Sequence, residues 1–166
     1  MYRASLGAGK NIGHDVRVIM PKQKTIGELK KSGYKSLPIK EEIRNNLIRK
    51  IRDGETLFPG ILGFENTVIP QIENAILAGQ DIIFLGERGQ AKSRMIRGLI
   101  GLLDEEIPVI ANCEINDDPF APICSSCKGE IENQGDDVAI EWMARDLRYG
   151  EKLATPDITI ADLIGE

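Results

Sequence analysis

The sequence has no long uninterrupted hydrophobic run. None of its apolar stretches approaches the roughly 18 residues that a membrane-spanning helix needs. The N-terminal stretch MYRASLGAGKNIGHDVRVIM also lacks the continuous apolar segment of a signal peptide. These absences argue against a membrane partner and predict a cytoplasmic protein. Residues 1–23 show no sustained periodicity and are predicted to be a disordered tail.

Cysteine and histidine are scarce, with three cysteines and one histidine among 166 residues. An odd number of cysteines does not make a disulfide framework, so reduced thiols are expected. Residues 124–127 (CSSC) have the spacing of a zinc knuckle, and Cys113 could add a third ligand. A structural zinc site takes four ligands, however, and His14 is far away in the sequence. The sequence leaves zinc binding, a redox-active CxxC pair and ordinary thiols open.

Aromatic residues make up only 5% of the chain, and its net charge of −5 is unevenly distributed. Residues 1–52 hold 13 Lys/Arg against 4 Asp/Glu, whereas residues 53–166 hold 8 against 22. A basic segment can favour nucleic acid or an acidic protein surface. Because no aromatic residues interleave with the basic ones, nucleic acid is not expected as a partner. The charges of IKEEIRNNLIRKIR are predicted to form the solvated face of a helix.

The chain is long and apolar enough, at 42% hydrophobic residues, to bury one domain-sized core. Apolar residues recur at helical spacing in several segments. The predicted helices are a short one ending at Gly33, one over 39–52, one within ENTVIPQIENAILAGQ with a kink or late start at Pro70, and one over VAIEWMARDLRYG closed by Gly150. Residues 113–137, rich in turn-forming residues and cysteine, are predicted to be a long loop.

Residues 81–85 (DIIFL) form a short apolar run, typical of a strand buried in a parallel sheet. From Lys92 to Leu103 the pattern becomes helical, and residues 107–112 (IPVIAN) are a second predicted strand. The order of strand, glycine loop, helix and strand is a βαβ unit and predicts an α/β fold with a parallel sheet. We therefore expect strands 81–85 and 107–112 side by side, with the helix as a right-handed crossover.

A phosphate-binding motif lies between the first strand and the helix. Residues 86–93 (GERGQAKS) match the pattern G-x-x-x-x-G-K-[ST], except that Ala91 replaces the second glycine. Backbone N–H groups from Glu87 to Ser93 would point into one concavity that suits phosphates. Lys92 would reach the β- and γ-phosphates, and the Ser93 hydroxyl would bind Mg²⁺. A strand-turn-helix loop without a ligand is the alternative.

The segment FPGILGFENTVIPQIENAILAGQDIIFLGERGQAKS (58–93) resembles the start of the magnesium chelatase ATPase subunit and its MoxR-type relatives in the AAA+ superfamily. Those proteins have an aromatic-Pro segment, an Ile-Val-Gly-Gln box, a helix and a loop of the form G-x-R-G-x-G-K-[ST]. Here the box reads ILGF, with Phe64 in place of glutamine, and the loop keeps the Arg-Gly pair at 88–89. TPDITIADLIGE at the C-terminus resembles a stretch that the family carries after the P-loop.

The resemblance implies an AAA+ P-loop NTPase fold, a parallel sheet flanked by helices, and a set of nucleotide-binding residues. The box lies against the adenine in the family, and the P-loop holds the phosphates. Lys92 takes the catalytic position, and Ser93 contacts the metal. The implied cofactors are ATP and Mg²⁺, and the implied site residues are Ile61, Leu62, Gly63, Gly86, Glu87, Arg88, Gly89, Gln90, Ala91, Lys92, Ser93 and Arg94.

Later parts of the family pattern would follow Glu166: the Walker B acids, the sensor-1 residue, the arginine finger and the helical lid. The chain is therefore expected to be a truncated fragment or the product of a broken gene, with a helical N-terminal extension over 24–56 and the first part of an AAA+ core over 57–166. Asp104-Glu105 imitate Walker B acids but follow the helical pattern, so they are predicted to be the solvated end of the P-loop helix.

Two functions follow as expectations. The first is the ATP- and Mg²⁺-binding part of an ATPase whose complete form is a homo-oligomeric ring that remodels an unidentified partner protein. The second is a non-hydrolysing nucleotide-binding regulatory module, which could carry a small zinc-binding CxxC loop. In either case the chain alone is expected to bind ATP or ADP and to hydrolyse ATP negligibly, because phosphoryl transfer needs the missing groups.

Overall fold

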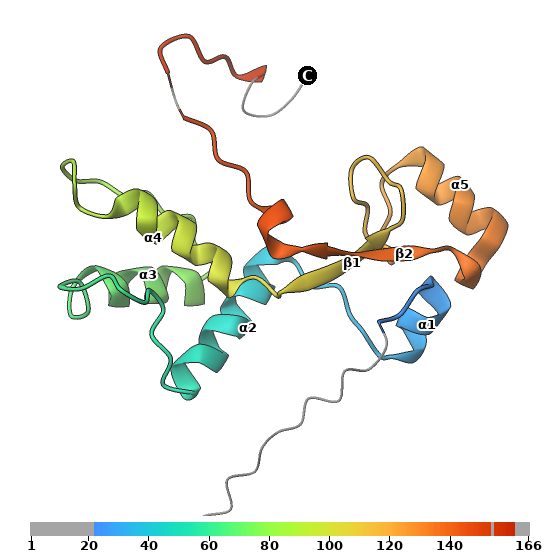
Figure 1. Ribbon diagram of the computed structural model, residues 1–166, viewed down its shortest axis with the longest axis horizontal. Coiled ribbons are helices and arrows are strands. Elements are labelled where there is room, and N and C mark those ends of the chain that lie inside the picture. Colours follow the sequence, from blue (N-terminus) through green and yellow to red (C-terminus); the bar gives the residue numbers. More distant parts are fainter. Residues whose placement is uncertain (1–21, 154, 162–166) are drawn as a thin grey trace, which may run out of the picture.

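The computed structural model describes residues 22–153 and 155–161. Helices α2, α3 and α4 gather on one side of the molecule and α1 and α5 on the other, with a two-stranded ribbon between them (Figure 1). The elements in chain order are α1 (Ile26–Lys31), α2 (Ile39–Arg52), α3 (Val68–Leu77), α4 (Lys92–Gly98), the 3₁₀ helix η1 (Leu99–Leu102), β1 (Glu106–Ile110), α5 (Ser125–Gln134), η2 (Gly135–Asp137), β2 (Ile140–Ala144) and η3 (Arg145–Arg148).

The helices predicted before residue 104 are confirmed. Helix α1 is capped by Thr25, whose side chain accepts a hydrogen bond from the Glu28 N–H, and the chain leaves it through Gly33 at φ +76°. Helix α2 has the predicted bounds. Pro70 is the third residue of α3. N–H groups in the first turn of a helix have no acceptor within it, so the missing N–H of Pro70 costs no hydrogen bond, and α3 simply starts late.

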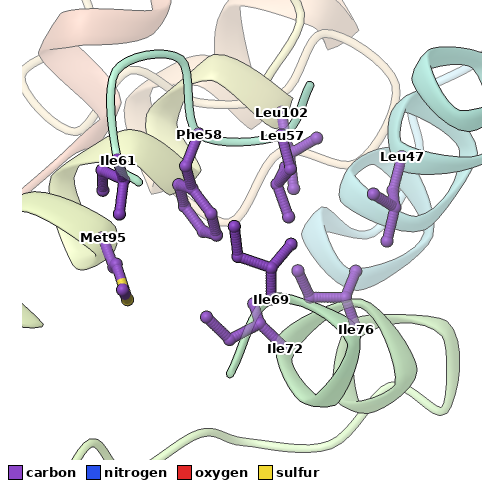
Figure 2. Close-up of a cluster of buried hydrophobic side chains, with 9 residues drawn as sticks. All are labelled: Leu47, Leu57, Phe58, Ile61, Ile69, Ile72, Ile76, Met95 and Leu102. Carbon is purple, nitrogen blue, oxygen red and sulfur yellow. The ribbon is translucent and has the colours of Figure 1, made fainter. Parts of the chain in front are cut away.

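The first hydrophobic core joins α2, α3, α4 and the connector that precedes α3 (Figure 2). The ring of Phe58 lies at its centre and packs so closely on α4 that a Cβ at Gly98 would come within 2.8 Å of it. The buried members are Leu47, Leu57, Phe58, Ile61, Ile69, Ile72, Ile76, Met95 and Leu102. This core fixes the position of the connector against the helix that carries the motif lysine.

The second core lies at the other end of the ribbon. Its buried members are Ile26, Leu29, Ile110, Cys127, Val138 and Ile140. Helix α1 therefore packs on the β1–β2 end of the molecule, whereas α2 packs on α3 and η1. The segment over 24–56 is helical as predicted, but its two helices are built into different cores together with later parts of the chain.

The prediction of a helix over 138–150 is wrong. Residues 140–144 form β2, which pairs with β1 in antiparallel register from Glu106↔Ala144 to Ile110↔Ile140. The alternation of buried Val138 and Ile140 with exposed Ala139 and Glu141 has a period of two, which suits a strand. The strand predicted over 107–112 is confirmed as β1, which begins one residue earlier and ends two residues earlier.

The predicted loop over 113–137 contains the ten-residue helix α5. Only Cys127 of this helix is buried, so the sequence offers no apolar stripe by which to recognise it.

Residues 81–85 differ from the prediction of a strand beside 107–112. They are extended but form no ladder with any described residue, and the sheet that the structure describes consists of β1 and β2 alone. The position next to β1 is taken by β2, which the sequence pattern had assigned to a helix. The parallel sheet of an AAA+ core therefore stays a prediction.

Two sequence predictions fall outside the described residues. They are the disordered tail, apart from its last two residues, and the DLIGE end of the C-terminal motif (162–166). Within the described ranges, no helix combines the length and the apolar character needed to cross a bilayer.

Candidate functional site

The loop from Gly86 to Ala91 joins the extended segment 81–85 to α4 and changes handedness repeatedly. Gly86, Gly89 and Ala91 have φ values of +150°, +84° and +55°. At Gly86 and Gly89 the positive φ alone would strain any other residue, and a Cβ at Gly86 would also displace the end of the Gln90 side chain. Turns in which left-handed residues alternate with right-handed ones form concavities of N–H groups that suit anions. The backbone thus explains two of the glycines in this loop.

Ala91 occupies the position at which the P-loop pattern has glycine, and its conformation gives the reason for that preference. With φ 55° and ψ 13° it lies in the left-handed region, immediately before α4. An L-residue pays about 1–2 kcal/mol for this conformation, whereas glycine does not. The left-handed conformation at this position therefore accounts for the preference for glycine.

Lys92 is the first residue of α4, and its side chain turns back into the loop. Its Nζ donates hydrogen bonds to the carbonyl oxygens of Gly86, at 2.9 Å, and of Glu87. The ammonium group is therefore held by neutral oxygens, with no carboxylate as a partner in these bonds. Ser93, the next residue, is exposed. The loop thus presents a cation and a hydroxyl side by side at one end of α4.

The ILGF box lies beside the P-loop helix. A Cβ added to Gly60 would come within 3.0 Å of the Arg94 guanidinium, and Ile61 shares the first core with Met95. Ile61 is buried, whereas Leu62 is 81% exposed. Gly63, at φ +86°, donates its N–H to the Glu65 carboxylate at 2.8 Å. The structure thus places the box against α4, the helix that follows the phosphate loop, with the Leu62 side chain exposed.

The extended segment before the loop is covered on one face only. Ile82 and Phe84 are half-buried against the first core, whereas Ile83 and Leu85 are 83% and 88% exposed. An apolar cavity of about 450 Å³ lies next to it, between this segment and helices α2, α3 and α4. A segment that is apolar on both faces matches a strand that is buried on both faces.

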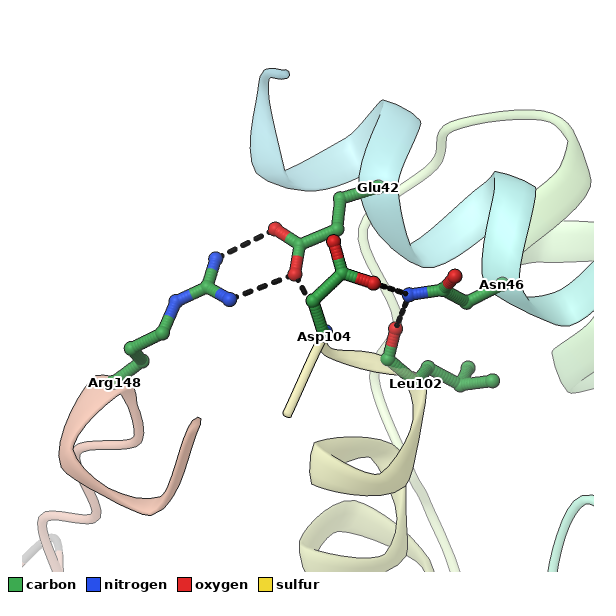
Figure 3. Close-up of polar contacts among 5 residues, drawn as sticks. All are labelled: Glu42, Asn46, Leu102, Asp104 and Arg148. Carbon is green, nitrogen blue, oxygen red and sulfur yellow. Dashed lines mark hydrogen bonds and ion pairs between the residues drawn. The ribbon is translucent and has the colours of Figure 1, made fainter. Parts of the chain in front are cut away.

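The sequence predicted that Asp104 and Glu105 form the solvated end of a helix. For Asp104 this is wrong, because both its side chain and its backbone make hydrogen bonds inside the protein. Figure 3 shows that its Oδ1 accepts from Asn46 Nδ2, at 2.9 Å, and that its backbone N–H donates to Glu42 at 2.7 Å. Glu105 is exposed as predicted. Asp104 therefore takes part in a polar cluster that also holds Arg148 and Glu42. The prediction that the charges of α2 are all solvated is wrong for Glu42, which is buried because this cluster supplies its hydrogen bonds.

The same cluster contains a buried ion pair. Arg148 donates two hydrogen bonds to Glu42, at 2.7 and 2.6 Å, and the two side chains are 10% and 5% exposed. Burial opposes ionisation of Glu42, but its bonds to Arg148 and to the Asp104 N–H hold its pKa below the ordinary value. The pair ties α2 to the chain that follows β2, so its place is structural.

The three cysteines converge, which the sequence alone had left open. Cys113 follows β1, Cys124 caps the N-terminus of α5 and Cys127 lies in its first turn. Their sulfur atoms and a carboxylate oxygen of Asp117 all lie within 4.8 Å of one another. Burial raises the pKa of Cys127 to about 12, whereas a hydrogen bond from the backbone at Asp117 lowers that of Cys113. All three cysteines are free thiols.

This thiol cluster, defined as Cys113, Cys124, Cys127 and Asp117, is the one group of three or more Cys, His, Asp or Glu side chains placed to share a metal ion within the described ranges. Within those ranges Ser93 belongs to no such group, and a role of the loop in binding nucleotide phosphates stays a prediction.

Comparison with known proteins identifies no relative of this chain. A scan against protein-family models, a search of curated proteins and a search of solved structures each found no match to the chain. The candidate sites rest on their own residues and geometry.

Proposed function

We propose that this chain is the ATP-binding part of an AAA+ ATPase of the magnesium chelatase and MoxR type. The observation that carries the proposal is the environment of Lys92, whose ammonium is folded back onto the carbonyls of Gly86 and Glu87. A phosphate entering the loop would replace these two neutral acceptors with charged oxygens, which make stronger hydrogen bonds. The lysine is thus positioned where the phosphates would lie.

The neighbouring box supports the same proposal. Its backbone runs beside α4 at Gly60 and Arg94, and Leu62 is exposed there. An adenine ring bound against Leu62 and Gly63 would cover apolar surface that is now open to water. Nucleotide binding would then join the two sequence motifs that carry the family resemblance.

ATP hydrolysis by this chain alone is not part of the proposal. Ser93 would supply one ligand to Mg²⁺, but a second protein ligand and a water-positioning group are needed for turnover. In complete form the proposed ATPase is a cytoplasmic homo-oligomeric ring that uses ATP to remodel a partner protein. The uncovered face at Ile83 and Leu85 supports this idea of a larger sheet, because further strands there would bury both side chains.

The experiment is a calorimetric titration of ATP and of ADP, each with Mg²⁺, into the purified chain and two variants. Lys92→Ala should weaken binding at least about 30-fold, since removing one partner of a charged hydrogen-bonded pair costs about 2–5 kcal/mol. Lys31→Ala, an exposed lysine of α1 at the other side of the molecule (Figure 1), is the matched control and should bind as the unmodified chain does.

Binding that is indifferent to Lys92→Ala would contradict the proposal. Steady-state phosphate release measured on the same samples separates the two functions expected from the sequence. The ATPase is supported if the isolated chain releases negligible phosphate but hydrolyses ATP once the rest of the core is supplied. Binding that never leads to turnover supports the regulatory module instead.

A further inference from the structure

The thiol cluster lies away from the P-loop, and the proposed nucleotide site does not use it. We propose that Cys113, Cys124 and Cys127 bind one zinc ion, with the carboxylate of Asp117 as the fourth ligand. The ion joins the loop that leaves β1 to the first turn of α5, and its role is structural.

The geometry of the sulfur atoms suits this ion. Around a tetrahedral zinc with Zn–S bonds of about 2.3 Å, the sulfur atoms lie about 3.8 Å apart. The four ligand atoms of the cluster are already within 4.8 Å of one another, so side-chain adjustments of about 1 Å or less bring them to bonding positions. Two of the ligands come from a CxxC pair and the third from a separate turn, a division that zinc sites commonly have.

The backbone of the loop is shaped around the cluster. Asn112 and Asn116 adopt left-handed conformations, at φ 59° and 52°, on either side of Cys113. The Cys113 N–H donates to the Ile110 carbonyl at 3.3 Å, and the Asn116 N–H donates to the Cys113 carbonyl at 3.1 Å. These bonds hold Cys113 in a tight turn that faces the start of α5.

Asp117 has the position and the free lone pairs of a fourth ligand. Its side chain is 5% exposed and accepts hydrogen bonds from the N–H groups of Ile123, at 3.0 and 2.9 Å, and Cys124, at 2.8 Å. With the Asp118 N–H, three backbone N–H groups bond to a carboxylate that has about four lone-pair sites, which leaves one site for a bond to metal. Carboxylates that ligate metals are themselves usually hydrogen-bonded in this way, which fixes their orientation.

The site is open to solvent. It also lies where a metal ion would stabilise the fold. A cavity of about 550 Å³ beside the cluster is lined by all three cysteines, which provides a path for the ion. The second core has only six buried members, and no helix or strand lies between β1 and α5. A metal bond across that loop would add stability where apolar burial is sparse.

The test begins with metal analysis of the reduced full chain after exposure to ZnCl₂ and gel filtration, and with its cobalt(II) derivative. About one zinc per chain and the charge-transfer absorption of thiolate-bound cobalt are expected. Cys113→Ser should lose both, and Asp117→Asn should keep the cobalt–thiolate absorption but bind zinc at least about 10-fold more weakly, the loss caused even by changing a residue that only orients a ligand. Ser126→Ala, which alters an exposed residue inside the CxxC pair, is the control and should bind as the unmodified chain does.

Thermal unfolding with and without a chelator provides a second, independent measurement. Removing zinc from the unmodified chain should lower its melting temperature, and the chelator should leave that of Cys113→Ser unchanged. Less than one zinc per ten chains, equal zinc binding by Cys113→Ser, or a Cys124–Cys127 disulfide that forms in preference to metal binding would overturn the proposal.

Discussion

At the scale of single residues, Ala91 shows how a one-letter departure from a motif is accommodated. Its left-handed backbone angles are those that glycine adopts without strain, and the loop keeps them with alanine in place. The hydrogen bonds from Lys92 into the loop are formed as well. Alanine in place of glycine therefore raises the free energy of the loop conformation but leaves the shape of the loop unchanged.

Ala91→Gly should raise the free energy of unfolding by up to about 1 kcal/mol. Relief of the left-handed strain, about 1–2 kcal/mol, outweighs the entropy that glycine adds to the unfolded chain, about 0.5–1 kcal/mol. Nucleotide affinity should change by no more than about 1–2 kcal/mol, within the ordinary range of glycine and alanine effects. Urea denaturation and calorimetry measure the two quantities.

The matched control is Ala78→Gly. Ala78 follows α3 with φ −84°, where alanine is unstrained, so the same substitution should lower stability by about 0.5–1 kcal/mol. Equal effects at the two positions would contradict the conformational explanation. Nucleotide binding that appears only after Ala91→Gly would mean that the native loop no longer binds.

At the scale of elements, the polar cluster around Glu42 connects parts of the chain that are far apart in sequence. Glu42 and Asn46 come from α2, Asp104 from the turn before β1, and Arg148 from η3 after β2 (Figure 3). Asn46 Nδ2 also donates to the Leu102 carbonyl at 2.8 Å. Helix α2 is thereby tied to both strands of the ribbon through hydrogen bonds rather than apolar contacts.

Arg148→Ala should lower the free energy of unfolding by about 3 kcal/mol, because it leaves the buried Glu42 carboxylate without its charged partner. The control is Arg97→Ala, which breaks an ion pair with Glu151 of similar geometry but with both side chains about half exposed. That pair should be worth less than about 1 kcal/mol. Chemical denaturation of the two variants measures both changes in the free energy of unfolding. Similar losses would show that the Glu42–Arg148 pair contributes no more than a surface ion pair.

At the scale of the whole molecule, the segment 81–85 is an apolar stretch that is open to solvent on one face. Its two outward side chains are almost fully exposed although they are apolar, and its backbone pairs with no described strand. Exposed apolar strands with unpaired backbone groups tend to associate. We expect this segment to govern self-association of the chain.

Ile83→Lys and Leu85→Lys should leave the free energy of unfolding within about 0.5 kcal/mol of the unmodified value, since both positions are exposed. The same changes should reduce self-association in sedimentation velocity at high protein concentration. Phe84→Ala is the contrasting variant, because Phe84 packs against the first core and its loss should cost stability. A large loss of stability in the lysine variants would show that Ile83 and Leu85 already have partners.

The amino-acid sequence by itself determined the elements that depend on local information. Helices α1, α2 and α3 follow from apolar spacing and from stop signals at Gly33, Asp53 and Gly79, and the start of α4 follows from the motif at Lys92. These features are decided by residues a few positions apart, which is why they can be recognised without the fold. The choice between helix and strand over 138–150 failed because a five-residue strand carries too little pattern.

Only the tertiary structure decided which distant residues meet. Pairing of β2 with β1, the contact of Glu42 with Arg148 and the convergence of Cys113 on the CxxC pair each join residues that no local pattern relates. Burial in a shared core selects such partners, because a polar or charged group removed from water must find its hydrogen bonds inside the protein. The sequence supplied the thiols and the charges, and packing placed them together.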